Sequence, residues 1–295
     1  MEIKLSKYCD FCFGVKRASG LIEEALEGAK GPFYSLGPFI HNPRVVEKFS
    51  QKGLKTISSL RDIKGGTLVI RSHGISPNVL KKAKALGLKL LDVTCPNVKK
   101  SQEIVSFLAR QNYKIIIVGD KTHPEVKSLI GTCGASRAFV VNRSETLKKL
   151  KLKGARVGVI AQTTQSKIKY LKILTKLLEK DFSEIKIYNT ICEDTLSRQK
   201  EASLIARDVE MMLILGGKMS ANSRRLTQIS RASGAPTYHI ESASQIKPEW
   251  LKRKASVGVA GGASTPKWIV TEAVKKIIQE RGDSSKCSVK LNKKI

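Results

Sequence analysis

The sequence repeats one pattern three times, and this repetition constrains the fold more than any other feature. Each copy reads as a buried strand, a glycine, a short polar loop, a helix and a further strand. The copies begin at Tyr34, Ile116 and Leu213. A second pattern, of a strand, a small polar tip and a helix, follows each copy. Its copies begin at Val69, Val159 and Val259. Internal repeats of this kind indicate similar structural modules.

Apolar, strand-like runs alternate along the chain with amphipathic helical stretches. The clearest strand-like runs are Thr67–Ile70, Lys114–Val118, Arg156–Ile160, Met211–Leu215 and Ser256–Ala260. Strands that alternate with helices predict parallel sheets joined by right-handed crossovers. We therefore predict an α/β fold of three similar modules, with mostly parallel sheets arranged around a pseudo-threefold axis.

The repeats also set the predicted module boundaries. The modules span residues 13–95, 96–192 and 193–280. The third module has no last strand of its own, so we expect the N-terminal segment 1–12, with a strand over residues 2–8, to complete it. Residues 281–295 lack periodicity and are expected to form a disordered tail.

One cysteine recurs at a similar place in each module: Cys12, Cys95 and Cys192. Cys95 and Cys192 each follow an apolar run and an Asp or Asn, and each precedes a helical pattern, while Cys12 ends a looser copy. Ligands gather beyond the carboxyl ends of parallel strands, so we expect the three thiols to face one metal centre. Three thiolates suit an iron–sulfur cluster or a zinc ion with one position left open, and their spacing does not decide between the two. The other cysteines, Cys9, Cys133 and Cys287, are predicted to be structural or idle thiols.

Composition limits the cellular compartment in which we expect the protein and the kind of partner it can have. The N-terminus does not read as a signal peptide and no run is long enough to span a membrane, so we expect a cytoplasmic protein without a membrane partner. In a reducing cytosol, grouped thiols are more often metal ligands or catalysts than disulfides.

The chain carries 54 Lys and Arg against 25 Asp and Glu, a formal net charge of +29. This charge predicts attraction to phosphates, nucleic acid or an acidic protein, although a lysine-rich surface that only faces solvent would give the same net charge. Aromatic residues make up only 5% of the chain, which argues against stacking platforms for single-stranded nucleic acid.

Polar side chains gather at the predicted strand ends. Histidines stand at three of these tips, and the third module offers two serines and an asparagine; these residues are His41, His73, His123, Ser220, Asn222 and Ser264. Donors of this kind at helix starts suit a phosphate, although helix capping explains several of them as well. Two interpretations are likewise open for Glu125 and for the run Gln162–Thr164. Either they stabilise the start of a helix, or they belong to a site that transfers protons.

At these residues the chain resembles the 4-hydroxy-3-methylbut-2-enyl diphosphate reductase (LytB/IspH) family. The shared motifs run in the same order over residues 1–280. They are Phe11-Cys-Phe-Gly-Val15, Arg71-Ser-His-Gly74, Asp92-Val-Thr-Cys-Pro96, Gly119 to Val126 with His123 and Glu125, Gln162-Thr-Thr164, and Ser220 to Leu226 with Asn222.

The resemblance implies a central [4Fe-4S] cluster with one open iron, held by Cys12, Cys95 and Cys192. It implies the reductive removal of the allylic hydroxyl of the diphosphate substrate, the last step of the non-mevalonate isoprenoid route. It assigns Glu125, Thr163 and His123 to catalysis. The substrate-binding set implied is His41, His73, His123, Thr163, Ser220, Ala221, Asn222 and Ser264. The expected electron donor is an acidic ferredoxin or flavodoxin.

Two residues depart from the family pattern. Asp10, beside the additional Cys9, stands where the family usually has glycine, and its carboxylate would either lower the potential of a cluster or face solvent. Ala221 stands where a second serine is common, so that one hydrogen bond to the diphosphate is lost or comes from the backbone. The main alternative is a zinc-dependent hydrolase of a phosphorylated substrate. A nucleic-acid binder rests on charge alone, and we predict no nucleic-acid partner.

Overall fold

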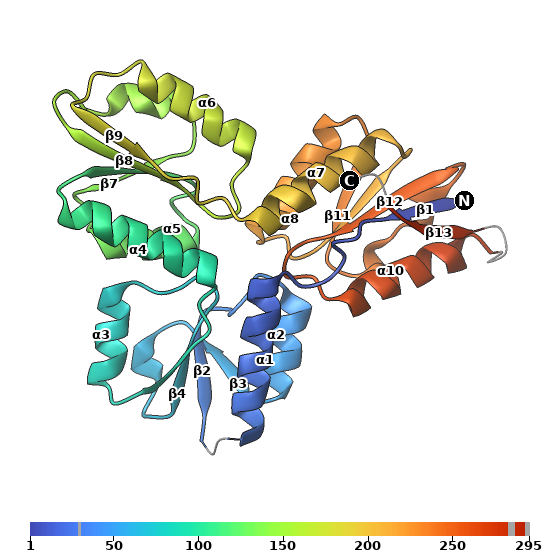
Figure 1. The fold of residues 1–295 in the computed structure, drawn as a ribbon. Helices are drawn as coiled ribbons and strands as arrows, with labels where there is room; N and C mark the ends of the chain where they lie inside the picture. The colour runs from blue at the N-terminus through green and yellow to red at the C-terminus, as the bar shows by residue number, and fades with distance from the viewer. Residues whose placement is uncertain (29–30, 283–286, 293–295) are drawn as a thin grey trace. The chain divides into compact units, whose positions relative to one another are not determined.

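The computed structural model describes residues 1–28, 31–282 and 287–292, and in these ranges the strands form three parallel sheets (Figure 1). The chain divides into two compact units. The first unit comprises Met1–Lys16, Ile40–Lys48 and Glu193–Ile295, and the second comprises Arg17–Phe39 and Phe49–Cys192. Each unit is described by itself below.

The first unit contains a five-stranded sheet, here called sheet A, with the order β11-β10-β12-β1-β13. Its strands are β1 (Glu2–Leu5), β10 (Met212–Leu215), β11 (Thr237–Ile240), β12 (Ser256–Gly261) and β13 (Ser288–Leu291). Its helices are α7 (Glu193–Arg207), α8 (Ala221–Ala232), the short α9 (Pro248–Leu251) and α10 (Lys267–Glu280), with a 3-10 turn at Ala243–Gln245. All neighbouring strands run parallel, as the alternation of strands and helices predicts.

Both faces of sheet A are buried at its central strands β10 and β12, which is why these two strands form continuous apolar runs in the sequence. Successive side chains of a strand point to opposite faces, so Leu213 and Leu215 pack with Ile269 and Ile277 of α10. Met212 and Ile214 pack on the other face with residues of α7 and α8, including Ile205 and Leu226. In Figure 1, α10 accordingly lies on one side of sheet A and α7 with α8 on the other.

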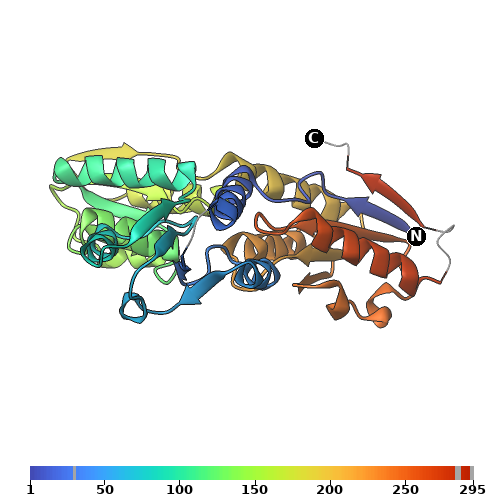
Figure 2. The ribbon, with the colours of Figure 1, turned by 90° about the horizontal axis from the view of Figure 1, so that it is seen from below.

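The C-terminal segment corrects one prediction. Ser288–Leu291, part of the predicted disordered tail 281–295, forms β13 and pairs in parallel with β1, so that both terminal strands lie side by side in sheet A (Figure 2). The sequence did not reveal this strand because it is only four residues long and its side chains are exposed. Residues 283–286 and 293–295 of the predicted tail lie outside the described residues.

The second unit contains two four-stranded parallel sheets. Sheet B has the order β3-β2-β4-β5 and comprises β2 (Phe33–Leu36), β3 (Leu54–Ile57), β4 (Thr67–Ile70) and β5 (Lys89–Asp92). Sheet C has the order β7-β6-β8-β9 and comprises β6 (Lys114–Val118), β7 (Ala138–Val141), β8 (Arg156–Ala161) and β9 (Glu184–Ile187). The helices are α3 (Pro77–Ala85), α4 (Pro96–Arg110), α5 (Pro124–Cys133) and α6 (Lys167–Leu178), with 3-10 turns at Leu60–Asp62 and Ser144–Lys149.

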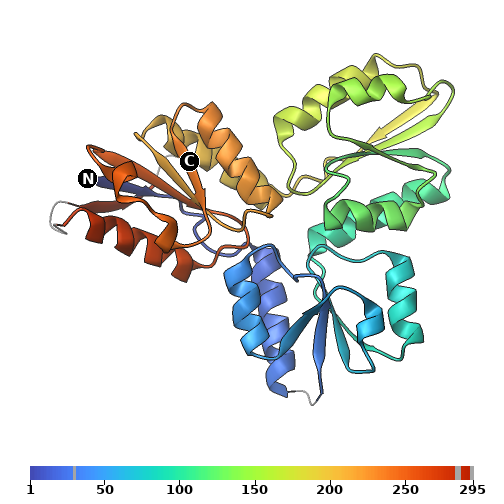
Figure 3. The same ribbon diagram turned by 180° about the vertical axis from the view of Figure 1, so that it is seen from behind.

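Two further helices have residues in both units: α1 (Phe13–Gly28) and α2 (Pro43–Gln51). In sheet C, α4 and α5 cover one face and α6 the other, as the views in Figure 1 and Figure 3 agree. The core beneath α4 and α5 contains Leu108, Ile115, Ile117 and Leu129, all fully buried.

The predicted strands Thr67–Ile70 and Lys114–Val118 are confirmed to the residue as β4 and β6. The three parallel α/β sheets confirm the predicted fold class, while the module boundaries, the threefold arrangement and the central place of a cluster stay predictions. Among the described helices, none combines the length and low polarity that a membrane crossing requires.

Candidate active site

The three repeat-related cysteines share one local setting: each directly precedes a helix. Cys12 precedes α1, Cys95 is the N-cap of α4, and Cys192 precedes α7. The first amides of a helix have no partner within the helix and its dipole is positive at this end, so both favour a thiolate. The backbone N–H of Val15 indeed points to Sγ of Cys12, at 3.5 Å.

In the second unit, Cys95 and Cys192 lie near one another. Burial raises the pKa of the Cys95 thiol, the backbone amides of Asn97 and Val98 counteract part of this rise, and the neighbouring Cys192 adds to it. The side-chain amide of Asn97 donates to Sγ of Cys192 at 3.1 Å. Sulfur atoms surrounded by N–H donors are a suitable donor set for a soft metal centre.

A buried carboxyl group lies in the same unit. Glu125, in the first turn of α5, is 1% exposed. The backbone N–H and the hydroxyl of Thr163, which follows β8, each donate to one of its oxygens at 2.7 Å. Burial raises the pKa of Glu125 to about 7, against the lowering effect of these two hydrogen bonds. The group can therefore hold or release a proton near neutral pH, as a general acid must.

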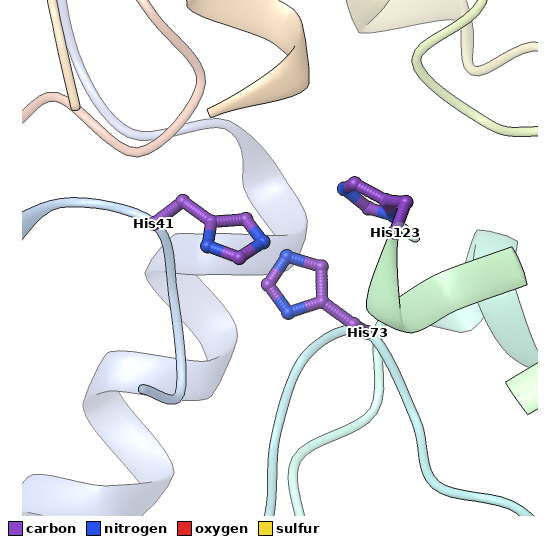
Figure 4. A group of neighbouring side chains, drawn as sticks. All are labelled: His41, His73 and His123. Carbon is purple, nitrogen blue, oxygen red and sulfur yellow. The ribbon is translucent and has the colours of Figure 1, made fainter. Parts of the chain in front are cut away.

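Two of the predicted histidines face each other beside this carboxyl group. The rings of His73 and His123 have centroids 5.4 Å apart and meet edge to face (Figure 4). Nδ1 of His123 accepts the backbone N–H of Glu125 at 3.2 Å. In the neutral ring the hydrogen therefore sits on Nε2, which can donate it to an anionic oxygen. His41 belongs to the first unit and is described with it.

The loop that carries His73 is fixed by close packing. Gly74 has φ +72°, which favours glycine, and a Cβ there would lie 2.7 Å from Nε2 of Gln102 in α4. The same amide donates to Oγ of Ser128 in α5 at 2.7 Å, and this hydroxyl donates to the carbonyl of Ile75. Gln102 and Ser128 thus hold the His73 loop against the helix that begins after His123.

In the first unit, three loops bring His41, Ser264 and the tip after β10 together. The hydroxyl of Ser264 donates to the carbonyl of His41 at 3.3 Å, and the side-chain amide of Asn42 donates to the carbonyl of Ser264 at 2.8 Å. A Cβ at Gly217 would lie 2.2 Å from the carbonyl oxygen of His41, so only glycine permits this approach.

The start of α8 offers further polar groups. Ser220 is its N-cap and accepts the N–H of Ser223, and Ala221 is its first residue. Asn222 is only 2% exposed, and neither polar atom of its side chain has a hydrogen-bond partner among the described residues. A buried amide without partners is costly in a folded chain, so this group fits a ligand that supplies both a donor and an acceptor, or bound water.

Asp10, which departs from the family pattern, and the neighbouring Cys9 each have a defined structural setting. Oδ1 of Asp10 accepts the backbone N–H of Phe11 at 2.7 Å and that of Lys267, at the start of α10, at 3.1 Å. Asp10 therefore caps α10. The thiol of Cys9 is buried in the core of sheet A and donates to the carbonyl of Val259, and burial raises its pKa to about 12. Both features fit structural roles.

The sequence did not single out several residues that support these loops: Asn42, Asn97, Gln102, Arg198 and Glu201. Arg198 carried one signal, because Thr195, Arg198, Ala202 and Ile205 follow helical spacing and are all buried. A charged residue on the apolar face of a helix indicates a buried, paired charge. The fourth histidine, His239, lies in β11, and its Nε2 forms a hydrogen bond with the carbonyl of Gly216 at 2.9 Å.

Parallel α/β sheets, thiols at helix starts, facing histidines and a buried carboxyl group are together typical of an enzyme that uses a metal centre on an anionic substrate. Comparison with known proteins makes the class specific. The family model described as LytB protein matches residues 3–278, so the chain belongs to the LytB family.

Curated relatives carry one name. The chain is 42% identical over 277 residues to the 4-hydroxy-3-methylbut-2-enyl diphosphate reductase of Pelobacter propionicus, covering 94% of this chain and 98% of the relative. It is also 42% identical over 285 residues to the enzyme of the same name from Aquifex aeolicus, with 95% and 96% covered.

Two solved structures are similar over nearly the whole chain. The structure of the E-1-hydroxy-2-methyl-but-2-enyl-4-diphosphate reductase from Plasmodium falciparum matches with a TM-score of 0.92 and 27% identity, covering 99% of this chain and 92% of that one. A structure of (E)-4-hydroxy-3-methyl-but-2-enyl diphosphate reductase, described as the terminal enzyme of the non-mevalonate pathway, matches with a TM-score of 0.66 and 39% identity, covering 94% and 99%.

Proposed function

We propose that the protein reduces 4-hydroxy-3-methylbut-2-enyl diphosphate to isopentenyl and dimethylallyl diphosphates, the last step of the non-mevalonate isoprenoid route. The reaction consumes two electrons and two protons, breaks the allylic C–O bond and releases water. The observation that carries the proposal is the buried Glu125–Thr163 pair, in a chain of the LytB family. A carboxyl group with a pKa of about 7 suits protonation of a leaving hydroxyl at neutral pH.

The proposed cofactor is a [4Fe-4S] cluster held by Cys12, Cys95 and Cys192. The setting of the three thiols supports it, because each lies at a helix start where amides and the helix dipole favour the thiolate that a metal requires. When bound, the cluster would supply electrons and a Lewis-acidic iron for the substrate hydroxyl.

Each unit contains candidate diphosphate ligands. In the second unit, His73 and His123 offer ring N–H donors. In the first, the candidates are His41, Ser220, Ala221, Asn222 and Ser264, and Ala221 can contribute only its backbone N–H. The unsatisfied Nδ2 of the buried Asn222 supports this assignment most directly, because a diphosphate oxygen can accept its N–H. Donors held by fixed loops orient a bound diphosphate and with it the carbon–oxygen bond to be broken.

The proposed proton path runs from Glu125 through Thr163 to the substrate hydroxyl. When Glu125 is protonated, its O–H can donate to Oγ1 of Thr163, since these oxygens lie 2.7 Å apart. The hydroxyl hydrogen of Thr163 is then released from Glu125 and can turn toward the leaving oxygen. His123, whose Nδ1 accepts the N–H of Glu125, keeps the start of α5 in place for this transfer.

The proposed electron donor is an acidic ferredoxin or flavodoxin, in the cytoplasm. The net charge of +29 supports this choice, because a basic surface attracts acidic partners over distances near the Debye length.

Anaerobic purification with substrate turnover tests the function. We expect a brown protein with iron and sulfide that absorbs near about 400 nm, as thiolate-ligated iron–sulfur clusters do, and that converts the diphosphate substrate when given a reductant. A colourless protein with one zinc per chain that hydrolyses a phosphorylated substrate would establish the alternative reaction instead.

A further inference from the structure

Helix α7 carries two buried charged residues for which the reaction described above has no use. Arg198 is 4% exposed and Glu201 is fully buried, one turn apart on the helix. Burying charged groups costs several kcal/mol per ion, at about the scale of a domain's whole stability, unless hydrogen bonds compensate for the lost water. The partners of these two side chains therefore indicate what the helix holds in place.

The guanidinium of Arg198 donates to three backbone carbonyls in two different segments, the loop after β1 and the end of β12. Nη1 donates to the carbonyl of Tyr8 and, at 3.1 Å, to that of Gly261, and Nη2 donates to the carbonyl of Asp10 at 2.9 Å. Nε donates to the carboxylate of Asp194 at 2.7 Å, which balances the charge. The fork of five N–H groups on arginine can serve acceptors in several directions at once, and the ammonium of lysine cannot match it.

Glu201, on the same helix, binds residues of the same N-terminal segment. Its carboxylate accepts the hydroxyl of Ser6 and, at 3.1 Å, the backbone N–H of Lys7. The residues that follow β1 are thus bound by α7 through both their N–H and their carbonyl groups. This pairing explains why β1 ends at Leu5, before the predicted strand end at residue 8.

The two segments that Arg198 joins lead to proposed site residues. Tyr8 and Asp10 lie just before Cys12, and Gly261 lies three residues before Ser264. The segments are also joined directly, because the N–H of Cys12 donates to the carbonyl of Ala263 at 2.9 Å. A shift of the Arg198 side chain would therefore displace a cofactor ligand and a substrate ligand together.

We propose that Arg198 is a positioning residue that sets Cys12 and Ser264 in a fixed relation, so that cofactor binding and substrate binding depend on one buried contact. The inference rests on the proposed function for the roles of these two residues. It concerns the first unit alone and requires no contact between Arg198 and the substrate.

The test compares Arg198→Gln and Arg198→Lys with Arg207→Gln, an exposed arginine on the same helix. In metal-free protein, hydrogen exchange followed by mass spectrometry measures how fast the backbone amides exchange in the peptide that contains Cys12. We expect its protected amide to exchange at least about tenfold faster in Arg198→Gln, as loss of a buried charged hydrogen-bond donor implies. Arg198→Lys should lie between this variant and the wild type, because it keeps the pair with Asp194, and Arg207→Gln should match the wild type.

Two further measurements use the protein with its cluster bound. Iron release to a chelator should be about tenfold faster in Arg198→Gln than in the wild type, since ligand-supporting groups commonly change metal affinity by tenfold or more. The KM for the diphosphate substrate should rise more than kcat per cluster falls, because Ser264 is displaced as well.

Two outcomes would overturn the inference: wild-type exchange at Cys12 in Arg198→Gln, or an equal increase of exchange in β10, which would make Arg198 a general stabiliser of sheet A. Arg198→Lys allows the same comparison if Arg198→Gln does not fold. A wild-type protein that lacks iron and turnover would refute the proposed function, while the exchange experiment on metal-free protein would still test the role of Arg198.

Discussion

Thr163 donates two hydrogen bonds to Glu125, one from its backbone and one from its hydroxyl, each 2.7 Å long. Both bonds favour the ionised carboxylate, yet burial outweighs them and raises the pKa of Glu125 to about 7. The pair therefore combines a proton held near neutral pH with a hydroxyl placed to pass it on. Loss of the proton on Glu125 and loss of the hydroxyl of Thr163 should therefore have different effects.

Glu125→Gln removes the proton but keeps the shape of the side chain. We expect turnover to fall by about 10²- to 10⁴-fold, the usual contribution of a positioned acid. Iron content and substrate binding should stay close to those of the wild type, as measured by iron assay and by substrate-induced spectral change. Glu103→Gln, at an exposed position on α4, is the control. Turnover within twofold of the wild type would refute the proton role of Glu125.

The stability of the metal-free protein should depend on pH through the same carboxyl group. Its pKa is about 7 in the folded chain, against an ordinary value of 4.5, so the folded state binds more protons between these values. The free energy of unfolding therefore falls as pH rises through this window, by about 3 kcal/mol in all for a shift of this size.

Glu125→Gln cannot titrate, so its stability relative to the wild type should increase from pH 5 to pH 8. Urea unfolding of both proteins at the two pH values measures the difference. A difference that stays constant over this range would contradict the raised pKa.

Asn222→Ala tests whether the buried amide serves a ligand. Since neither polar atom has a partner among the described residues, the substitution should leave the free energy of unfolding unchanged or raise it. The affinity for the diphosphate substrate should fall about tenfold or more, as loss of a buried hydrogen-bonding pair implies. Thr227→Val, on the same helix, removes a hydroxyl that donates to the carbonyl of Ser223 within α8 and serves as the control. Loss of stability without loss of affinity would make Asn222 a structural residue.

Asp10→Ala removes the cap of α10. We expect the free energy of unfolding to fall by about 1 kcal/mol, as for other N-terminal caps. Iron content after reconstitution should remain that of the wild type, because the carboxylate points to the amides of Phe11 and Lys267. A large loss of iron at unchanged stability would assign Asp10 to the metal centre instead.

The attraction between the basic surface and an acidic electron donor should weaken with salt. At a net charge of +29, we expect kcat/KM for the donor to fall steeply as ionic strength rises from 0.01 to 0.15 M, since the Debye length shrinks from about 30 Å to about 8 Å. A small uncharged reductant should show no such dependence. Equal salt dependence for both reductants would remove the electrostatic argument.

Much of the fold could be predicted because buried parallel strands leave a clear trace in the sequence. β4 and β6 are continuous apolar runs and were predicted to the residue, whereas β1 ends three residues early because Ser6 and Lys7 bond to Glu201. β13 was missed because its four exposed side chains show no burial pattern.

The residues of the candidate site also differ in whether the sequence could predict them. Residues that we propose take part in the reaction, such as Glu125 and His123, stand in motifs at strand ends and could be found. Arg198 and Asn42 act on backbone carbonyls of distant loops, and a carbonyl belongs to every residue, so no sequence pattern marks these contacts. For Asp10 the sequence left open whether its carboxylate lowers the potential of a cluster or faces solvent, and it gave no sign of the hydrogen bond with the first N–H of α10.

The place of β1 in sheet A also fixes an order of events during synthesis. Within the part of the chain that the structure describes, β1 pairs with β12 and β13, which follow all the strands of sheets B and C in the sequence, and the N–H of Cys12 donates to Ala263. β1 must therefore wait for strands that are synthesised much later, while sheets B and C find their strand partners earlier. Cys12 reaches its final setting only after β12 has been made, so a centre that needs this thiol cannot be completed before then.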